Sequence, residues 1–325
     1  MRVLVTGGFG FVGRHLAQHL VKSGDDVGLT YFKEESKDPI VDKLCPLPKA
    51  VQTLALDIRD GKACKELMMV LRPDAIYHLA GVPTVHDASG DDFQRVNETN
   101  VQGTINMLEA LKHHSPATRF LFVSSSEVYG EPRPGTLPLT ELATMRPVNS
   151  YGLSKAWADV ATFTYSMRDS LDTVRIRPFP HIGPGQTDRF SISSFARQVA
   201  QIKLGKKKAV IEVGNLEAKR DFSDVSDIVR GYREIMLNGK KHDVYNLCSG
   251  KSIGVGEVLQ KLIKIAEVEV EIQVDQARLR PIDISDHYGS YDKAQKDVGW
   301  KPRIDFEATL HSLFAYWLEY EGMLK

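Results

Sequence analysis

The sequence predicts an α/β fold built on a doubly wound parallel sheet, and three observations support this prediction. Short runs rich in β-branched residues alternate with longer segments of helical periodicity through the first 180 residues. A glycine-rich turn follows the first of these runs directly. Hydrophobic residues make up 42% of the chain and charged residues 26%, as in globular proteins with a large core. Right-handed crossovers then place ligands at the carboxyl ends of the strands.

The expected elements follow in order along the chain. Short apolar runs predict strands at residues 2–5, 51–56, 75–79, 120–124, 173–176 and 244–247, with a further strand ending in the stretch 27–33. Helical periodicity predicts helices at residues 11–23, 96–113, 151–168 and 195–204. After residue 181, Gly183, Pro184 and Gly185 break the alternation. The remainder predicts a smaller lobe made from two separate segments.

Composition excludes several classes of protein. The chain has 42 Lys and Arg against 42 Asp and Glu, so no global field attracts nucleic acid or an anionic membrane. No apolar run approaches the roughly 18 residues that cross a bilayer. The three cysteines are far apart and have no metal-binding spacing, which predicts free thiols. Because the sequence also begins on a strand without a signal-peptide pattern, we expect a cytoplasmic protein that binds no metal, nucleic acid or membrane.

The turn after the first strand has the spacing of a dinucleotide-binding loop. It reads TGGFGFVG, in which Gly8, Gly10 and Gly13 match G-x-G-x-x-G. Gly7, Gly10 and Gly13 match a closely related spacing. Glycine permits the tight turn and lets backbone N–H groups approach a pyrophosphate at the positive end of the next helix. The expected cofactor-binding residues here are Gly7, Gly10, Phe11, Val12 and Gly13.

The end of the second strand favours NADP(H). An NAD-type site usually has an acid there to hold the ribose 2′-hydroxyl. The stretch 27–33 reads VGLTYFK and has none, so a 2′-phosphate would meet no repulsion. Arg14 and Lys33 are candidate cations for that phosphate. Glu34 and Glu35 follow closely, so NAD(H) stays an alternative.

The ends of the next two strands supply the other expected cofactor contacts. Asp57 ends its strand where a carboxylate can accept a hydrogen bond from the adenine amine. The expected set at these two strand ends is Asp57, Ile58, Leu79 and Ala80. These positions lie at the edge where a doubly wound sheet binds its ligand.

A tyrosine, a lysine and a serine form the candidate catalytic set. Tyr151 and Lys155 are spaced i and i+4 on a predicted helix, so they project from the same face. A phenol titrates near about 10 and is a poor acid at neutral pH. We expect the ammonium to lower the pKa of the tyrosine, which could then exchange a proton with an alcohol or a ketone. Ser124, Ser125 and Ser126 follow the fifth strand, where one hydroxyl can bind the reacting oxygen.

Collinear motifs over residues 2–318 resemble those of the extended short-chain dehydrogenase/reductases. In the first half these motifs read TGGFGFVG, HLAG (78–81), NVQGT (100–104), SSSEVYG (124–130) and YGLSK (151–155). In the second half they read RPFPHIGPGQ (177–186), GNLEAKRDFSDVSDIV (214–229), YNLCSG (245–250) and DVGWKP (297–302). Within this superfamily, RPF-x-HIGPGQ and NLEAKRDFSDV most resemble the GDP-4-dehydro-6-deoxy-D-mannose reductases. The resemblance implies a Rossmann domain and a sugar-nucleotide substrate.

The resemblance also implies a reaction. NADPH would reduce the 4-keto carbon of a GDP-linked 6-deoxy-hexose to give GDP-D-rhamnose. Tyr151 would protonate the developing alkoxide, and Lys155 would hold the nicotinamide ribose and tune Tyr151. Ser125 would hydrogen-bond the sugar oxygen, with Ser126 as the alternative. Glu127 lies where related dehydratases keep a catalytic acid or base.

The same resemblance assigns the substrate contacts. Arg220 and Arg280 match positions that bind the diphosphate, as expected of a guanidinium fork facing a pyrophosphate. Relatives carry Asn where this chain has Pro180, which offers neither a side-chain donor nor a backbone N–H. Either the adjacent His181 takes over that contact or the substrate differs. The expected substrate-binding residues are Ser126, His181, Arg220 and Arg280.

Two other function classes stay open. A nucleotide-sugar dehydratase or epimerase, such as a GDP-mannose 4,6-dehydratase, would reuse its nicotinamide without net turnover, and the sequence at residues 125–127 does not exclude it. A non-catalytic NADP-binding protein is the remote alternative. The intact set of Ser125, Tyr151 and Lys155 argues against it.

Domain organisation and assembly complete the expectations. We predict a dinucleotide-binding Rossmann domain at residues 1–180 plus about 225–250, and a substrate lobe at about 181–224 plus 251–325. The resemblance suggests a homodimer in which the helices at 96–113 and 151–168 form a four-helix bundle. Ala156, Val160 and Phe163 would serve this interface or belong to the core.

Overall fold

The computed structural model describes residues 1–32, 38–82, 92–279 and 284–324. Within these ranges, seven parallel strands form one sheet in the order β11-β6-β5-β4-β1-β2-β3. The strands are β1 Arg2–Thr6, β2 Asp26–Tyr31, β3 Gln52–Ala55, β4 Ala75–His78, β5 Arg119–Val123, β6 Thr173–Pro178 and β11 Val244–Leu247. The order reverses between β1 and β4, which is the switch point where such sheets bind ligands. The predicted doubly wound fold is confirmed.

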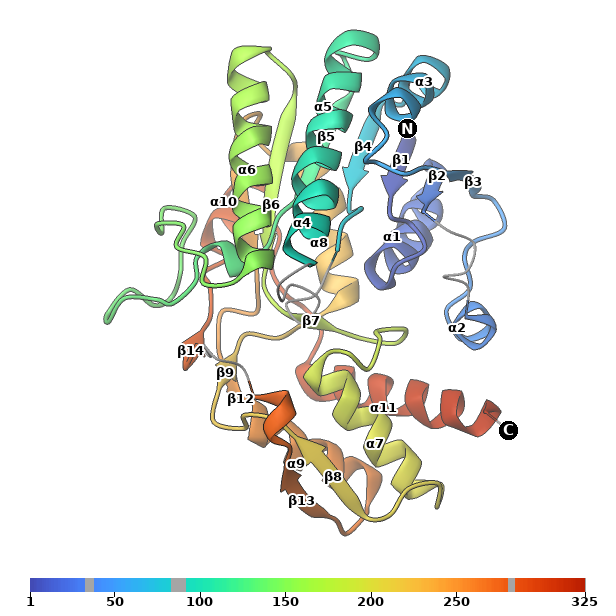
Figure 1. Cartoon of the computed structure of the whole chain (residues 1–325), viewed down its shortest axis with the longest axis vertical. Helices are drawn as coiled ribbons and strands as arrows, with labels where there is room; N and C mark the ends of the chain where they lie inside the picture. The colour runs from blue at the N-terminus through green and yellow to red at the C-terminus, as the bar shows by residue number, and fades with distance from the viewer. Residues whose placement is uncertain (33–37, 83–91, 280–283, 325) are drawn as a thin grey trace.

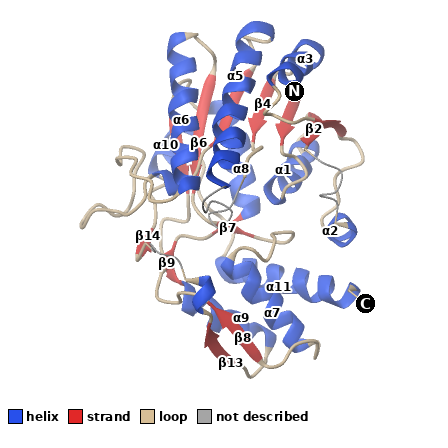
Figure 2. Cartoon of the chain, in the orientation of Figure 1, coloured by secondary structure: helices blue, strands red, loops and turns tan. Residues whose placement is uncertain are grey.

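Helices cover both faces of this sheet (Figure 2). One face packs against α1 Phe11–Lys22 and α8 Val225–Asn238, and the other against α3 Gly61–Leu71, α5 Gly103–His114 and α6 Ser150–Arg168. Successive side chains of a strand point to opposite faces, so Val3 and Val5 join the first core and Leu4 joins the second. Burial on both faces explains why these strands read as continuous apolar runs rather than alternating ones.

A second layer of structure lies beyond the carboxyl ends of the strands (Figure 1). Helices α7 Ser191–Lys203, α9 Val255–Ala266 and α11 Phe306–Met323 pack there against β8 Val210–Val213 and β13 Glu271–Val274. These elements come from two separate stretches of the chain, between which α8 and β11 return to the large sheet. The exact domain boundaries stay a prediction.

The other elements in the described ranges are short. They are α2 Pro39–Leu44, α4 Asp92–Asn97, η2 Glu98–Gln102, η3 Ser126–Val128, β7 His181–Ile182, β9 Lys219–Arg220, β10 Ser223–Asp224, β12 Ile253–Gly254, η4 Gln276–Arg278, β14 Asp286–His287 and α10 Asp292–Val298. The helix expected at residues 96–113 begins at Asp92 and contains the π-helical turn η2. The helix expected from residue 195 begins at Ser191. The prediction placed its start too late because the first turn is rich in serine and does not show the apolar pattern. None of the helices in the described ranges combines the length and apolar character needed to cross a membrane.

Candidate active site

A cavity of about 1110 Å³ along the carboxyl edge of the sheet brings the predicted site residues together. Apart from the candidate cation Arg14, its lining includes every predicted site residue that lies in the described ranges: Gly7, Gly10, Phe11, Val12, Gly13, Asp57, Ile58, Leu79, Ala80, Ser125, Ser126, Glu127, Tyr151, Lys155, His181 and Arg220. Lys33 and Arg280 lie outside the described residues. The first residues of α1 thus share one cavity with the serines after β5 and the first turn of α6, although the roles of the individual residues stay proposals.

The glycine turn is packed too tightly for side chains. Gly7 has a φ of +70°, and a Cβ there would lie 2.9 Å from the Cα of Ala80. A Cβ at Gly13 would lie 2.6 Å from the carbonyl oxygen of Gly7. The amide of Gly8 is bonded to the carbonyl of Thr30 at 2.9 Å, so this glycine serves packing against β2. The cavity is therefore lined by the Gly7-x-x-Gly10-x-x-Gly13 set, and not by Gly8.

The start of α1 can receive an anion. Gly10 is its N-cap, and no acidic residue occupies its first turn. The first N–H groups of a helix have no intrahelical partner and carry the positive end of its dipole. Phe11, Val12 and Gly13 hold these groups at the cavity wall. A pyrophosphate fits this position by charge and by hydrogen-bonding capacity.

Arg14 does not reach the cavity, so the prediction that it meets a 2′-phosphate is wrong. Its side chain is buried, and its guanidinium donates to the carbonyls of Phe9 at 3.1 Å and Cys45 at 3.0 Å. It also pairs with Asp42 at 2.5 Å. These contacts fasten the segment that contains α2 onto α1, which is a packing role. The position of that segment depends on tertiary structure, and the sequence pattern therefore does not reveal it.

Asp57 lies in the cavity wall with a partner that the sequence analysis missed. Its carboxylate accepts from Arg59 through Nε at 2.9 Å and Nη2 at 2.7 Å. These bonds hold the pKa of Asp57 below its ordinary value. The predicted contact of Asp57 with an adenine amine stays a prediction, and the carboxylate that would make it is already oriented by Arg59.

Ser125, Glu127 and Tyr151 are held together by the start of α6. Asn149 caps this helix by accepting from the amide of Gly152 at 2.7 Å. Its amide nitrogen donates to the carboxylate of Glu127 at 2.8 Å. The hydroxyl of Ser125 accepts from the amide of Glu127 at 3.2 Å and is hydrogen-bonded to Tyr151. One helix cap therefore positions the candidate acid or base beside the candidate proton donor.

The pKa of Tyr151 is shifted in the direction opposite to the prediction. Burial raises it to about 12, the hydrogen bond with Ser125 opposes that rise, and the charge of Glu127 adds to it. Lys155 is not among the groups that shift this pKa. The expectation of an ammonium-lowered phenol is therefore wrong for the protein without its ligands. The reason is desolvation, which favours the neutral phenol.

Lys155 lies in an apolar environment one helical turn further along α6. Its Nζ donates to the carbonyl of Val123 at 2.8 Å and lies 5.2 Å from the centre of the Phe122 ring. Burial lowers its pKa to about 8, while the negative charge of Asp159 opposes the shift. Strongly shifted pKa values of buried groups that line a cavity are typical of functional sites.

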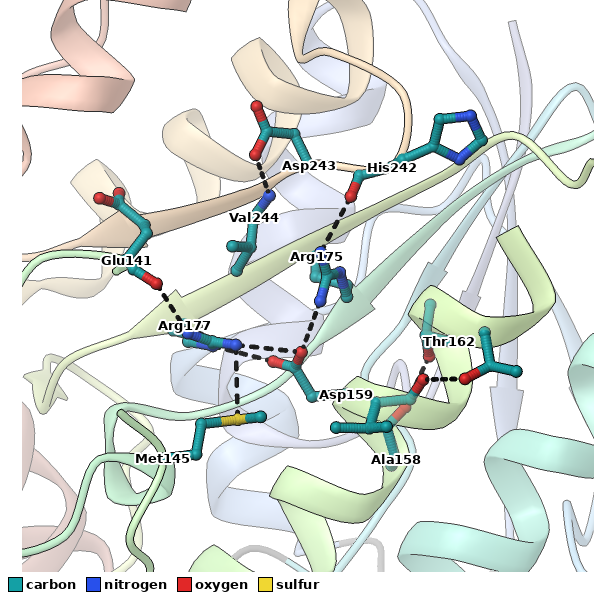
Figure 3. Close-up of polar contacts among 12 residues, drawn as sticks. Glu141, Met145, Ala158, Asp159, Thr162, Arg175, Arg177, His242, Asp243 and Val244 are labelled. Carbon is teal, nitrogen blue, oxygen red and sulfur yellow. Dashed lines mark hydrogen bonds and ion pairs between the residues drawn. The ribbon is translucent and has the colours of Figure 1, made fainter. Parts of the chain in front are cut away.

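A buried charge cluster anchors the other side of α6 (Figure 3). The carboxylate of Asp159 accepts from Arg175 at 2.9 Å and from Arg177 at 2.9 and 3.2 Å. Arg175 also donates to the carbonyl of His242 at 2.9 Å, and Arg177 to that of Glu141 at 3.4 Å. Although burial raises the pKa of Asp159, the two arginines outweigh burial and hold it below its ordinary value. The cluster ties α6 to β6, to the turn before β11 and to the loop that precedes α6.

Two of the predicted substrate contacts, His181 and Arg220, line the cavity from β7 and β9. His181 donates through Nδ1 to the carbonyl of Phe179 at 2.9 Å, and its ring lies parallel to that of Phe11 with centres 6.2 Å apart. Burial lowers the pKa of His181, so it is neutral near pH 7. Pro180 lines the same wall. Arg220 donates to the carbonyl of Ile284 at 2.6 Å from the strand β9.

Several further cations line the cavity that were not among the predicted site residues. Arg59, Arg95, Arg189 and Arg278 reach it from four separate segments. Nothing in the local pattern distinguishes them from surface arginines, except that Arg59 follows closely after the end of a strand. Together with Lys155 and Arg220 they outnumber the acidic residues in the described part of the lining, which are Asp57, Glu127 and Asp188. A cavity with this balance suits a ligand with several phosphates.

Comparisons with known proteins agree with the geometry. A family model described as GDP-mannose 4,6 dehydratase matches residues 4–313. The GDP-6-deoxy-D-mannose reductase of Pseudomonas aeruginosa is 35% identical over 97% of each chain. GDP-mannose 4,6 dehydratase 1 of Arabidopsis thaliana is 27% identical over 94% of this chain and 86% of its own.

Solved structures are similar over almost the full length. The structure of RMD from Pseudomonas aeruginosa complexed with NADPH has a TM-score of 0.84 and 33% identity, covering 98% of this chain and 97% of that one. The complex of the Thermus thermophilus UDP-glucose 4-epimerase with NAD has a TM-score of 0.85 and 25% identity, covering 100% of both chains.

Proposed function

Because this chain belongs to the GDP-mannose 4,6 dehydratase family, within the extended short-chain dehydrogenase/reductases, we propose that it is an NADPH-dependent reductase of a nucleotide-linked 4-keto-6-deoxy sugar. The substrate we propose is GDP-4-dehydro-6-deoxy-D-mannose, reduced to GDP-D-rhamnose. The observation that carries this proposal is the shared cavity, which brings Ser125, Tyr151 and Lys155 to the same space as the glycine turn. The relative with 35% identity is a reductase, and this favours reduction over dehydration.

The residues of the turn fit a dinucleotide cofactor. The turn admits no Cβ at Gly7 or Gly13, and the first three residues of α1, Phe11 to Gly13, line the cavity. When bound, NADPH would supply the hydride. The residues proposed to hold it are Gly7, Gly10, Phe11, Val12, Gly13, Asp57, Ile58, Leu79, Ala80, Tyr151 and Lys155. The NADPH-bound structural relative supports NADP(H) over NAD(H).

Tyr151 is the proposed proton donor. A pKa of about 12 keeps its hydroxyl protonated at neutral pH, which a reduction requires. An alkoxide is a much stronger base than a phenolate, so the proton still moves toward the sugar oxygen. Ser125, already bonded to Tyr151, would hold that oxygen in place.

Lys155 would act after this transfer. Of its three N–H donors, the carbonyl of Val123 takes one, which leaves donors for the ribose hydroxyls and the new phenolate. Its predicted tuning of Tyr151 would require the bound cofactor, because in the protein without ligands Lys155 is not among the groups that shift the pKa of Tyr151. Glu127 is the proposed additional acid or base.

The substrate would lie between α6 and the second layer. Arg220 and the neutral His181 face the cavity from that side, joined by Arg189 and Arg278. Guanidinium groups bind diphosphate oxygens in a forked geometry. A nucleotide-diphosphate sugar, with guanine as the proposed base, matches this wall in charge.

Assembly as a homodimer is also proposed. On the outer face of α6, Trp157, Val160, Phe163 and Met167 are 47%, 47%, 40% and 58% exposed, whereas Ala156 belongs to the core. Apolar residues that gather on one helix face favour a partner helix. A second copy of this chain is the partner we propose. The buried free thiols agree with the cytoplasm as the proposed location.

Stoichiometry tests the reductase proposal. Purified protein should oxidise one NADPH for each 4-keto sugar consumed, with the product identified by NMR as the 4-hydroxy sugar. The variant Tyr151→Phe serves as the control for adventitious reduction. Conversion of GDP-mannose or of a 4-hydroxy sugar without net NADPH oxidation would instead identify a dehydratase or an epimerase.

A further inference from the structure

Arg59 lies in the cavity wall beside the ends of β2 and β3. It follows β3 and lines the cavity together with Tyr31, the last residue of β2, and Phe32, the next residue in the chain. The amide of Leu56 bonds to the carbonyl of Tyr31 at 2.9 Å, so the two strand ends are joined there. In the known chemistry of this fold, the end of β2 faces the adenosine ribose. Arg59 is therefore beside the position that a 2′-phosphate would occupy.

The guanidinium of Arg59 is held on two sides and keeps donors to spare. Its Cζ lies 5.1 Å from the centre of the Phe32 ring, and Asp57 binds its Nε and Nη2. A guanidinium has five N–H groups, and this fork uses only the Nε–Nη2 edge. The donors of Nη1 thus stay outside the pair with Asp57. The side chain is 37% exposed, so a ligand in the cavity can reach it.

Other cations do not compete for this role in the described part of the chain. Arg14 is buried against the carbonyls of Phe9 and Cys45. Arg95 lines the cavity from α4, and Arg189, Arg220 and Arg278 line it from segments outside the large sheet. Among the described residues, Arg59 is the cation that the loops after β2 and β3 contribute to the lining.

We propose that Arg59 selects NADP(H) over NAD(H) by donating from Nη1 to the 2′-phosphate, while Asp57 and Phe32 hold its guanidinium in position. The inference rests on the proposed use of NADPH. The choice between NADP(H) and NAD(H) would then be made in the loop after β3, whereas the sequence pattern placed it at the end of β2. Asp57 would then have two roles, because it orients Arg59 and would also contact the adenosine.

Binding of two small probes tests this directly. We would measure dissociation constants for adenosine 2′,5′-bisphosphate and for adenosine 5′-monophosphate by calorimetry. The wild type should bind the bisphosphate more tightly. In Arg59→Gln, affinity for the bisphosphate should fall about 10- to 100-fold, the range for a hydrogen bond between charged groups, while affinity for the monophosphate changes less than about twofold.

Two further variants make the test specific. Arg59→Lys keeps the charge but loses the fork with Asp57, so its loss should be intermediate. Lys62→Gln removes a positive charge from the same loop–helix junction, at an 85% exposed side chain outside the cavity lining, and should leave the preference unchanged. If Arg59→Gln weakened the binding of both probes equally, or left the preference for the bisphosphate unchanged, the role proposed for Arg59 would be wrong. The proposed use of NADPH would still stand. A wild type that binds both probes equally would overturn the proposed use of NADPH as well.

Discussion

Helix α6 presents two buried clusters that differ in how their charges are compensated. On the cavity side, Lys155 is buried and Tyr151 is half-buried, both with few polar partners, and their pKa values move toward the neutral forms. One turn further, Asp159 is buried at 0% exposure against two arginines, and its pKa moves toward the charged form. Lys155 and Asp159 are thus both buried on the same helix, yet their pKa values shift toward opposite charge states.

This difference separates a structural cluster from a functional one. A buried ion is tolerated when hydrogen bonds and opposite charges replace the water it has lost. Asp159 has these replacements within the protein itself. Tyr151 and Lys155 face a cavity instead, where a ligand can complete their environment. Incomplete compensation at a cavity wall is the physical signature of the proposed active site.

The largest expected effect belongs to the cavity side. Tyr151→Phe removes the hydroxyl that we propose as the proton donor, so turnover of the 4-keto sugar should fall about 10²- to 10⁴-fold. The thermal midpoint of unfolding should not fall, because the phenol leaves no charged partner behind. Steady-state NADPH oxidation and a melting curve check both points. Near-normal turnover would show that Tyr151 has another role.

On the compensated side, stability should respond instead. Asp159→Asn leaves Arg175 and Arg177 buried without their carboxylate, and should lower the free energy of unfolding by about 3–5 kcal/mol. The matched control is Asp172→Asn, whose pair with Arg119 has side chains 34% and 21% exposed, and it should cost less than about 1 kcal/mol. Urea unfolding measures both. Equal losses in the two variants would erase the distinction between the clusters.

The burial of Lys155 predicts a dependence of stability on pH. Its pKa is lowered from 10.5 to about 8 in the folded state, so the unfolded chain binds more protons between these values. Stability relative to Lys155→Met should therefore rise as pH increases from about 8 to 10.5, by a few kcal/mol at most. Urea unfolding of both proteins at pH 7 and pH 10 tests the sign. A difference that falls with pH would mean that Lys155 is stabilised as an ammonium.

The outward face of α6 should show the smallest effect on the isolated chain. Val160→Glu places a charge at a side chain that is 47% exposed, so the stability of the monomer should change by less than about 0.5 kcal/mol. If two copies pair through this face, the variant should shift sedimentation from dimer to monomer. Unchanged dimers would move the proposed interface elsewhere, and a monomeric wild type would exclude it.

Local sequence patterns predicted what depends on local chemistry. Strand β11 has the predicted bounds, and α1 and β1 differ from theirs by one residue at the C-terminal end, because apolar runs and the glycine turn determine them. The motif resemblance to the family is confirmed by the family model and the reductase relative. The cavity also collects the candidate residues, since strand ends of a parallel sheet meet at one edge.

The sequence did not reveal what depends on distant contacts. The burial of Arg14 requires Asp42 and Cys45 to dock against α1. The pKa of Tyr151 was predicted with the wrong sign, because spacing along a helix shows proximity to Lys155 but not the depth of burial. The sequence pattern did not indicate Arg59, because the position of its guanidinium depends on contact with Phe32, which precedes it by 27 positions in the sequence.

The protonation state of Tyr151 tests the central claim most directly. Tyrosinate absorbs in the near ultraviolet, so a pH titration of the wild type minus Tyr151→Phe isolates this one phenol in the protein without ligands. We expect no difference signal below pH 10 and ionisation only near about 12 or with unfolding. A phenolate signal at or below the ordinary value near about 10 would contradict the account, because it would mean that the ammonium outweighs burial at this site.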